Sequence, residues 1–150
     1  MQLTQKEMTL LKDLKGQEQL CIDKYTKHAT AAKDSQLSTL FTKLAGVEQH
    51  HLQMLTQIEG GSVPSPVSAS GSSQNFTATY NAQNSEDKKN DQYLCSDLLT
   101  TEKHASSLYD TCIFEFKDPQ LRTVLNSIQA EEQRHGEEIY KYMQTNSMYS

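Results

Sequence analysis

The chain has no tryptophan and no long run of apolar residues. Because no segment is long and apolar enough to cross a bilayer, we expect no membrane-spanning helix and no membrane partner. The first 15 residues, MQLTQKEMTLLKDLK, lack the apolar centre of a signal peptide, so we expect synthesis in the cytoplasm without export. Without tryptophan, the core must be built from leucine, isoleucine, methionine, tyrosine and phenylalanine.

Cysteine and positive charge are also scarce. The three cysteines, Cys21, Cys95 and Cys112, are odd in number and form no Cys-x-x-Cys pair, which argues against a disulfide framework and against a zinc knuckle. Cys21 and Cys95 fall at apolar positions of predicted helices, where we expect buried, reduced thiols. A net charge of −5 gives no basic footprint, so we expect no nucleic-acid partner.

What the sequence does contain is an internal repeat that places a glutamate 30 residues before a Glu-x-x-His motif, twice. The first copy consists of Glu18, Glu48 and His51; the second, 84 residues later, consists of Glu102, Glu132 and His135. Aligned without a gap, residues 8–58 and 92–142 are identical at 13 of 51 positions. We therefore expect two similar helical hairpins related by a pseudo-twofold axis.

Apolar residues recur at steps of three and four in four segments, which is typical of amphipathic helices. Thr4-Gln5-Lys6-Glu7 is a capping box, and Asp118-Pro119 supplies an N-cap followed by a first-turn proline. The predicted helices span about 4–33, 35–58, 86–117 and 119–144. The sequence thus predicts an all-α fold, with residues 1–150 forming one domain.

The link at 59–85 decides the predicted topology. It is rich in glycine, serine, proline, asparagine and glutamine and has no apolar period, so we expect a loop. An up-down-up-down bundle needs only a short link here, whereas these 27 residues are enough to return roughly 40 Å along the bundle. We therefore expect the second and third helices to run parallel. The predicted fold is a ferritin-like four-helix bundle, two hairpins joined by a long crossover loop.

This topology brings the repeated motifs together. Glu18 lies 16 residues before the turn at Asp34 and Glu48 lies 14 after it, so both are about 22 Å from the turn. The same arithmetic holds around Asp118 for Glu102 and Glu132. In a helix, residues i and i+3 share a face, so each Glu-x-x-His directs a carboxylate and an imidazole toward the same interior point.

All six motif residues fall within the apolar stripes, where a charged group must be paired or bound to a metal. Four carboxylates and two neutral imidazoles balance two divalent cations, and this ligand mixture suits iron or manganese while also accepting zinc or cobalt. We predict a two-metal site with Glu18, Glu48, His51, Glu102, Glu132 and His135 as ligands. The alternative is a structural polar layer that holds no metal.

Two tyrosines follow the same repeat. Tyr25 and Tyr109 each lie seven residues after a predicted ligand, on the same helix face two turns on. Three roles are open: hydrogen-bond donors behind the ligands, redox-active phenols, or core aromatics whose hydroxyl groups are satisfied elsewhere.

The order Glu, Glu-x-x-His, crossover, Glu, Glu-x-x-His resembles the ferritin-like di-metal superfamily, which includes bacterioferritins, rubrerythrins and manganese catalases. LTQKEMTLLKDLKGQEQLCIDKY, DLLTTEKHASSLYDTCIFEFKDPQLR and AEEQRHGEEIYKYM are similar to the Coat F family of spore coat proteins. The second resemblance implies synthesis in the mother cell, assembly into the spore coat and other coat proteins as partners. A second copy of the chain is a further candidate partner.

Two functions from different classes follow. One is a di-metal redox protein that handles peroxide or dioxygen or oxidises ferrous iron. The other is a structural coat component whose site is empty or holds an inert ion. The sequence leaves open whether the chain is an enzyme.

Overall fold

The computed structural model describes residues 2–68 and 74–149. These residues form four helices and no strand: α1 (Gln5–Ala31), α2 (Ser35–Glu59), α3 (Glu86–Glu115) and α4 (Pro119–Thr145). The all-α prediction is confirmed for the described part of the chain, and each helix end lies within two residues of its expected position. The finer ferritin-like assignment stays a prediction.

Side chains at the helix starts explain where the helices begin. The hydroxyl of Thr4 accepts from the backbone N–H of Glu7, whose carboxylate accepts from the N–H of Thr4, so the predicted capping box is present. Asp34, Ser85 and Asp118 each accept from a first-turn backbone N–H of α2, α3 and α4. Such caps satisfy backbone donors that have no partner within the helix.

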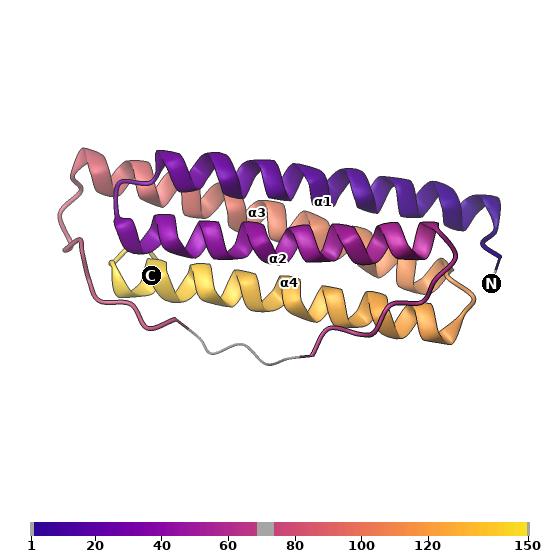
Figure 1. Cartoon of the computed structure of the whole chain (residues 1–150). Helices are drawn as coiled ribbons and strands as arrows, with labels where there is room; N and C mark the ends of the chain where they lie inside the picture. The colour runs from indigo at the N-terminus through magenta and orange to yellow at the C-terminus, as the bar shows by residue number, and fades with distance from the viewer. Residues whose placement is uncertain (1, 69–73, 150) are drawn as a thin grey trace.

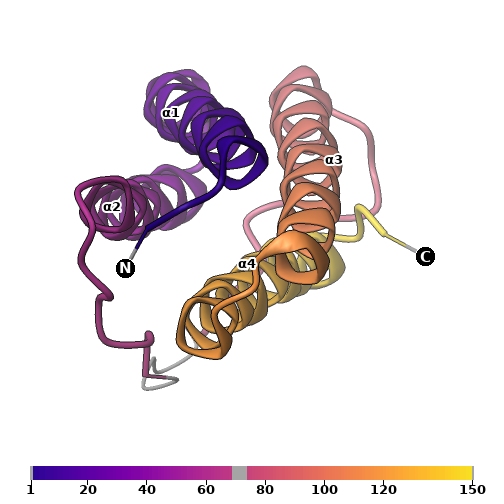
Figure 2. The same cartoon turned by 90° about the vertical axis from the view of Figure 1, so that its right-hand side faces the viewer.

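The four helices form an elongated bundle (Figure 1). α1 packs against α2 and α3, and α4 packs against α3 and α2, which makes α1–α4 and α2–α3 the diagonal pairs (Figure 2). Figure 1 shows α2 and α3 running in the same direction, as the long link predicts. The described parts of this link bond to α4, where the Val67 N–H donates to Ser127 and the Gln74 N–H to Glu138.

The 84-residue repeat recurs in contacts that close the ends of the bundle. Asp91 accepts from the backbone N–H groups of Lys33 and Asp34, at 2.8 and 3.0 Å. Its repeat counterpart Glu7 accepts from the N–H of Lys117, the counterpart of Lys33, at 3.2 Å. The start of α3 therefore holds the α1–α2 turn, and the start of α1 holds the α3–α4 turn.

The core consists of two apolar clusters. The first includes Tyr25, Phe41 and Leu98 and lies toward the α1–α2 turn, while the second includes Leu14 and Ile128 and lies toward the α3–α4 turn. Along every helix, the predicted ligands fall between these clusters. All three cysteines are buried and free, as expected for Cys21 and Cys95.

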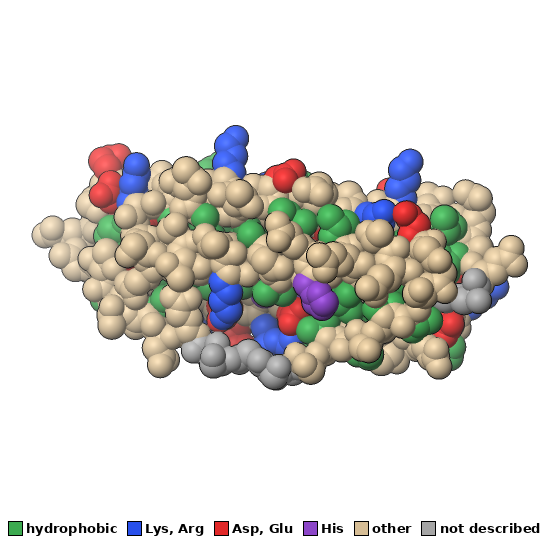
Figure 3. Space-filling view, viewed as in Figure 1, with side chains coloured by type: hydrophobic (Ala, Val, Ile, Leu, Met, Phe, Trp, Pro, Cys, Tyr) green, Lys and Arg blue, Asp and Glu red, His purple; other side chains and the backbone are tan. Residues whose placement is uncertain are grey.

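One face of the molecule carries side chains of both charges (Figure 3). On the face shown in Figure 3, basic and acidic side chains are interspersed among uncharged ones. Among the described helices, none combines the length and the apolar character that crossing a membrane requires.

Candidate metal centre

The structure brings all six residues of the repeated motif together inside the bundle. Each is at most 3% exposed. The residues are Glu18 on α1, Glu48 and His51 on α2, Glu102 on α3, and Glu132 and His135 on α4.

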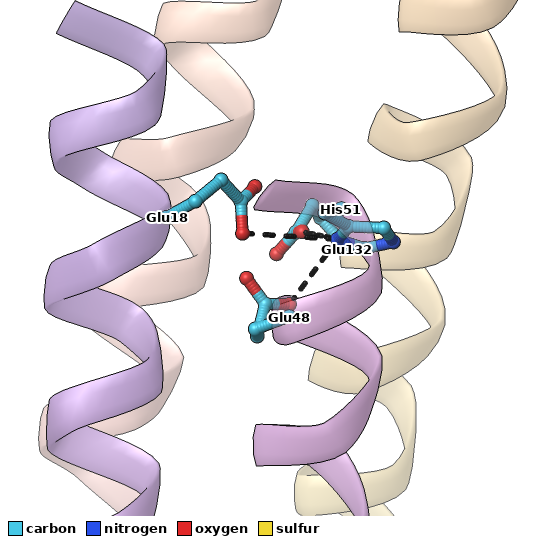
Figure 4. A group of neighbouring side chains, drawn as sticks. All are labelled: Glu18, Glu48, His51 and Glu132. Carbon is cyan, nitrogen blue, oxygen red and sulfur yellow. Dashed lines mark ion pairs between the residues drawn. The ribbon is translucent and has the colours of Figure 1, made fainter. Parts of the chain in front are cut away.

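The six residues form two overlapping groups of four. One group is Glu18, Glu48, His51 and Glu132, shown in Figure 4; the other is Glu48, Glu102, Glu132 and His135. Within each group, one ligand atom from every residue lies within 4.8 Å of the others. Glu48 and Glu132 belong to both groups, so their carboxylates lie where two ions would share them. Glu18 and Glu102 each belong to one.

Most of the ligand atoms in these two groups have no hydrogen-bond partner. In the described parts of the chain, nine buried side-chain nitrogen and oxygen atoms lack a hydrogen-bond partner, and all nine belong to the six residues. Eight of them are both oxygens of Glu48 and of Glu132, Oε2 of Glu18 and of Glu102, and Nδ1 of each histidine. Buried polar atoms are nearly always paired in folded proteins, so eight unpaired donors in one layer form a set suited to metal ions.

Each imidazole faces a glutamate of the other hairpin. His51 Nδ1 lies 2.8 Å from Glu132 Oε1, and His135 Nδ1 lies 2.9 Å from Glu48 Oε1. Neither approach has the geometry of a hydrogen bond, since all four atoms remain among the unpaired ones. The two hairpins therefore interlock at the two shared carboxylates.

The tyrosines of the repeat hold the outer carboxylates. Tyr25 donates to Glu102 Oε1 at 2.7 Å, and Tyr109 donates to Glu18 Oε1 at 2.5 Å. Each bond crosses between hairpins and leaves the second oxygen of its glutamate free. Burial, reinforced by the neighbouring carboxylates, raises the pKa of both phenols well above 10. Of the three roles left open by the sequence, the structure supports the hydrogen-bond donor.

One residue of the site was not predicted. Glu131 Oε1 lies 2.5 Å from Nε2 of His51, and its other oxygen accepts from Arg134 at 3.4 Å. Burial opposes ionisation of Glu131, but the bond to His51 outweighs it, so the pKa of Glu131 is lowered. Sequence reasoning missed this residue because its repeat counterpart is Val47. As a consequence Nε2 of His135 has no such partner, and it is the ninth unpaired atom.

The metal-free cluster must carry protons. Burial, with help from the neighbouring Glu48, raises the pKa of Glu18 to about 8. Burial and the nearby carboxylates raise the pKa of Glu132 well above 4.5. Burial raises the pKa of Glu48, but the close approach of Glu18 and of the two histidines outweighs burial and holds this pKa well below 4.5.

The imidazoles shift in the sense that favours their charged form. Burial alone would lower their pKa values, but the surrounding carboxylates outweigh it. The pKa of His135 rises to about 9, and that of His51 lies well above 6.5. At neutral pH, protons on Glu18 and His135 therefore take the place of positive metal charge, and the raised pKa values of Glu132 and His51 act in the same sense.

The match to known families lies in the second half of the chain. Residues 90–150 match the family model of the Coat F domain, a span that contains Tyr109, Glu102, Glu132 and His135. The rest of the motif, on α1 and α2, lies outside the match. Neither the curated proteins nor the solved structures compared with the chain include a match. The second half of this protein, which supplies half of the candidate metal centre, is thus similar to the Coat F domain.

Proposed function

We propose that this protein is a dinuclear metal protein of the spore coat that binds two divalent transition-metal ions, iron or manganese. The observation that carries the proposal is the convergence of eight unpaired donor atoms from Glu18, Glu48, His51, Glu102, Glu132 and His135. Four carboxylates match the charge of two divalent ions, and a set of oxygen and imidazole donors without thiolate suits iron and manganese.

The two overlapping groups suggest how the ions would be held. Glu18 and His51 would bind one ion, Glu102 and His135 the other, and Glu48 with Glu132 would bind both. Such a pair, when bound, supplies Lewis acidity and one- or two-electron redox chemistry toward dioxygen or peroxide.

The chain's own residues prepare this site in three ways. The hydroxyl groups of Tyr25 and Tyr109 fix the rotamers of the outer glutamates, and Glu131 fixes the ring of His51. The two apolar clusters exclude water on both sides of the polar layer. Because burial strengthens electrostatic interactions, the same carboxylates would bind cations more tightly here than at the protein surface.

The spore coat location is supported by the match of residues 90–150 to the Coat F domain and by the similar stretch at residues 3–25. Under this proposal the chain is made in the mother cell and its partners are other coat proteins. A second copy of the chain is a further candidate partner.

A structural coat component with an empty or inert site is the second candidate. It is favoured by the pKa shifts, because the raised pKa values of Glu18, Glu132 and the histidines let the layer hold protons in place of metal charge. In that case the bundle would fold and assemble whether or not ions were present.

Metal analysis of protein purified without chelator and reloaded with Fe(II) or Mn(II) tests the proposal. We expect two equivalents per chain, with Glu48→Gln losing both because each ion depends on that side chain. Glu86→Gln, at a side chain that is 92% exposed, is the matched control and should retain both.

Less than one equivalent in the unaltered protein would contradict metal binding. Peroxide consumption by the iron- and manganese-loaded forms separates the two candidates. Two bound ions with no turnover would favour the structural component, whereas turnover that is lost in Glu48→Gln would favour the redox protein.

A further inference from the structure

A groove between α3 and α4 leads from the surface to one side of the candidate metal centre. It encloses about 370 Å³, and Glu102 and Glu132 form part of its lining. Its walls include Leu99, Ser106, Gly136, Tyr140 and Tyr149. Two exposed residues of opposite charge, Lys103 and Glu137, also line the groove.

The matching groove in the first hairpin does not reach the candidate ligands. A groove between α1 and α2 is lined by repeat counterparts, including Gln19 and Gln49, but its lining reaches neither Glu18 nor Glu48. Ile22 and Leu52 stand there where the second hairpin has Ser106 and Gly136. Two small residues therefore open the second groove.

Exposure of the ligands shows the same asymmetry. Glu18, Glu48 and His51 are 0% exposed, whereas Glu102 and His135 each keep 3%. A Cβ atom at Gly136 would meet only Leu99 Cδ2, at 3.8 Å, so a longer side chain at this position would extend into the groove without first meeting backbone. The metal centre is thus approached from the α3–α4 side.

The chain's tail completes the groove. Ser147 has a φ of 57°, a conformation unusual for serine, and this reverses the chain after α4. The Met148 N–H then donates to the carbonyl of Met143 at 2.8 Å. As a result the ring of Tyr149 packs edge-on against Tyr140, with centroids 4.8 Å apart. The reversed tail adds a second aromatic ring to the wall.

We propose that this groove binds a small, uncharged, single-ring aromatic molecule with a hydroxyl group, and holds it beside Glu102 and Glu132. Pockets for organic ligands begin at about 300 Å³. Dioxygen or peroxide would need far less, since a water molecule occupies about 30 Å³ in the liquid. Tyr140 and Tyr149 offer ring edges and faces to an aromatic partner.

Charge selects within this class. The inner end of the groove, lined by Glu102 and Glu132, offers an anion no cationic partner, while Lys103 and Glu137 together give no net charge at the rim. A hydroxyl group can donate to a carboxylate, which fixes the orientation of the ring. As a substrate site, the groove rests on the proposed function; as a binding site, it can be tested without metal.

Phenol is the probe. Titrated into the full-length ¹⁵N-labelled chain, metal-free and zinc-loaded, it should shift the amide resonances of groove residues on α3 and α4 and saturate. Benzoate, an anion with the same ring, should bind at least tenfold more weakly. Gly136→Leu places at this position the residue type of its counterpart in the first hairpin, Leu52. This substitution should weaken phenol binding at least tenfold.

Gly46→Leu is the matched control, because a Cβ atom at that exposed helical glycine meets nothing within 4 Å. It should leave phenol binding unchanged. If Gly136→Leu does not fold, Ser106→Ile replaces it.

Three results would each overturn the proposal. They are equal binding of phenol by Gly136→Leu and the unaltered chain, resonance shifts centred on another surface, and equal binding of benzoate and phenol. Phenol binding by a chain that takes up no metal when metal is offered would contradict the proposed function alone, and two bound metals without phenol binding would contradict this inference alone.

Discussion

Raising the pH from 5 to 9 should destabilise the metal-free protein. The pKa of Glu18 is raised from 4.5 to about 8, and that of His135 from 6.5 to about 9. A group whose pKa is higher in the folded chain stabilises fully below its unfolded pKa and loses this contribution as the pH rises through the folded value. Glu132 and His51 shift in the same direction. The pKa of Glu48 shifts in the opposite direction, but its effect on stability is confined to pH values below 4.5.

The magnitude follows from the shifts. One pKa unit corresponds to about 1.4 kcal/mol, so Glu18 alone contributes about 5 kcal/mol that is lost between pH 4.5 and 8. His135 contributes about 3 kcal/mol, lost between pH 6.5 and 9. The two are not additive, because the groups share their protons and charges. Set against the usual 5–15 kcal/mol for a folded domain, even the Glu18 contribution brings the metal-free chain near its unfolding limit at pH 9.

Urea unfolding followed by circular dichroism measures this effect at several pH values, for metal-free and manganese-saturated protein. We expect the unfolding free energy of the metal-free form to fall by several kcal/mol, and that of the loaded form to stay nearly level, because ions replace the protons. Glu18→Gln, which keeps the shape but does not ionise, should make the fall in stability of the metal-free form less steep. A metal-free protein whose stability stays constant or rises from pH 5 to 9 would refute the reasoning.

Three further predictions follow from the contacts around the site. Metal binding at pH 7 should release protons, about two per chain from Glu18 and His135 alone, measured by calorimetry in buffers of different ionisation enthalpy; no release would contradict the protonated cluster. Tyr109→Phe should cost about 1–3 kcal/mol in thermal unfolding of the loaded protein, because the buried Glu18 oxygen loses its donor; a cost below 0.5 kcal/mol would mean that the bond is not formed. Glu131→Gln should weaken the ion nearer His51 by about 10- to 100-fold in a competition titration with a chelator, with Val47→Ala, at the counterpart position, as the control.

The repeat made much of the fold and most of the site predictable. Equal spacing of Glu18 and Glu48 about the turn fixes their common level, since helical rise is constant, and the length of the link sets the direction of α3. The capping box at Thr4 and the proline at α4 mark helix ends by local chemistry. These features depend on spacing along the chain.

The features that sequence reasoning missed depend on contacts between helices. The repeat counterpart of Glu131 is Val47, which is not a glutamate, and only the packing of α2 against α4 shows that Glu131 meets His51. The mutual capping by Glu7 and Asp91 and the groove opened by Gly136 likewise appear only once the hairpins are assembled. A single glutamate or glycine on a helix carries no local signal of such a contact.

The most direct test of the dinuclear site is anomalous diffraction from a crystal of the full-length protein soaked in Mn(II). We predict two anomalous peaks per chain: one beside Glu18 and His51, the other beside Glu102 and His135. Both should lie within bonding distance of Glu48 and Glu132. A single peak, peaks confined to the protein surface, or no peak at saturating manganese would contradict the account.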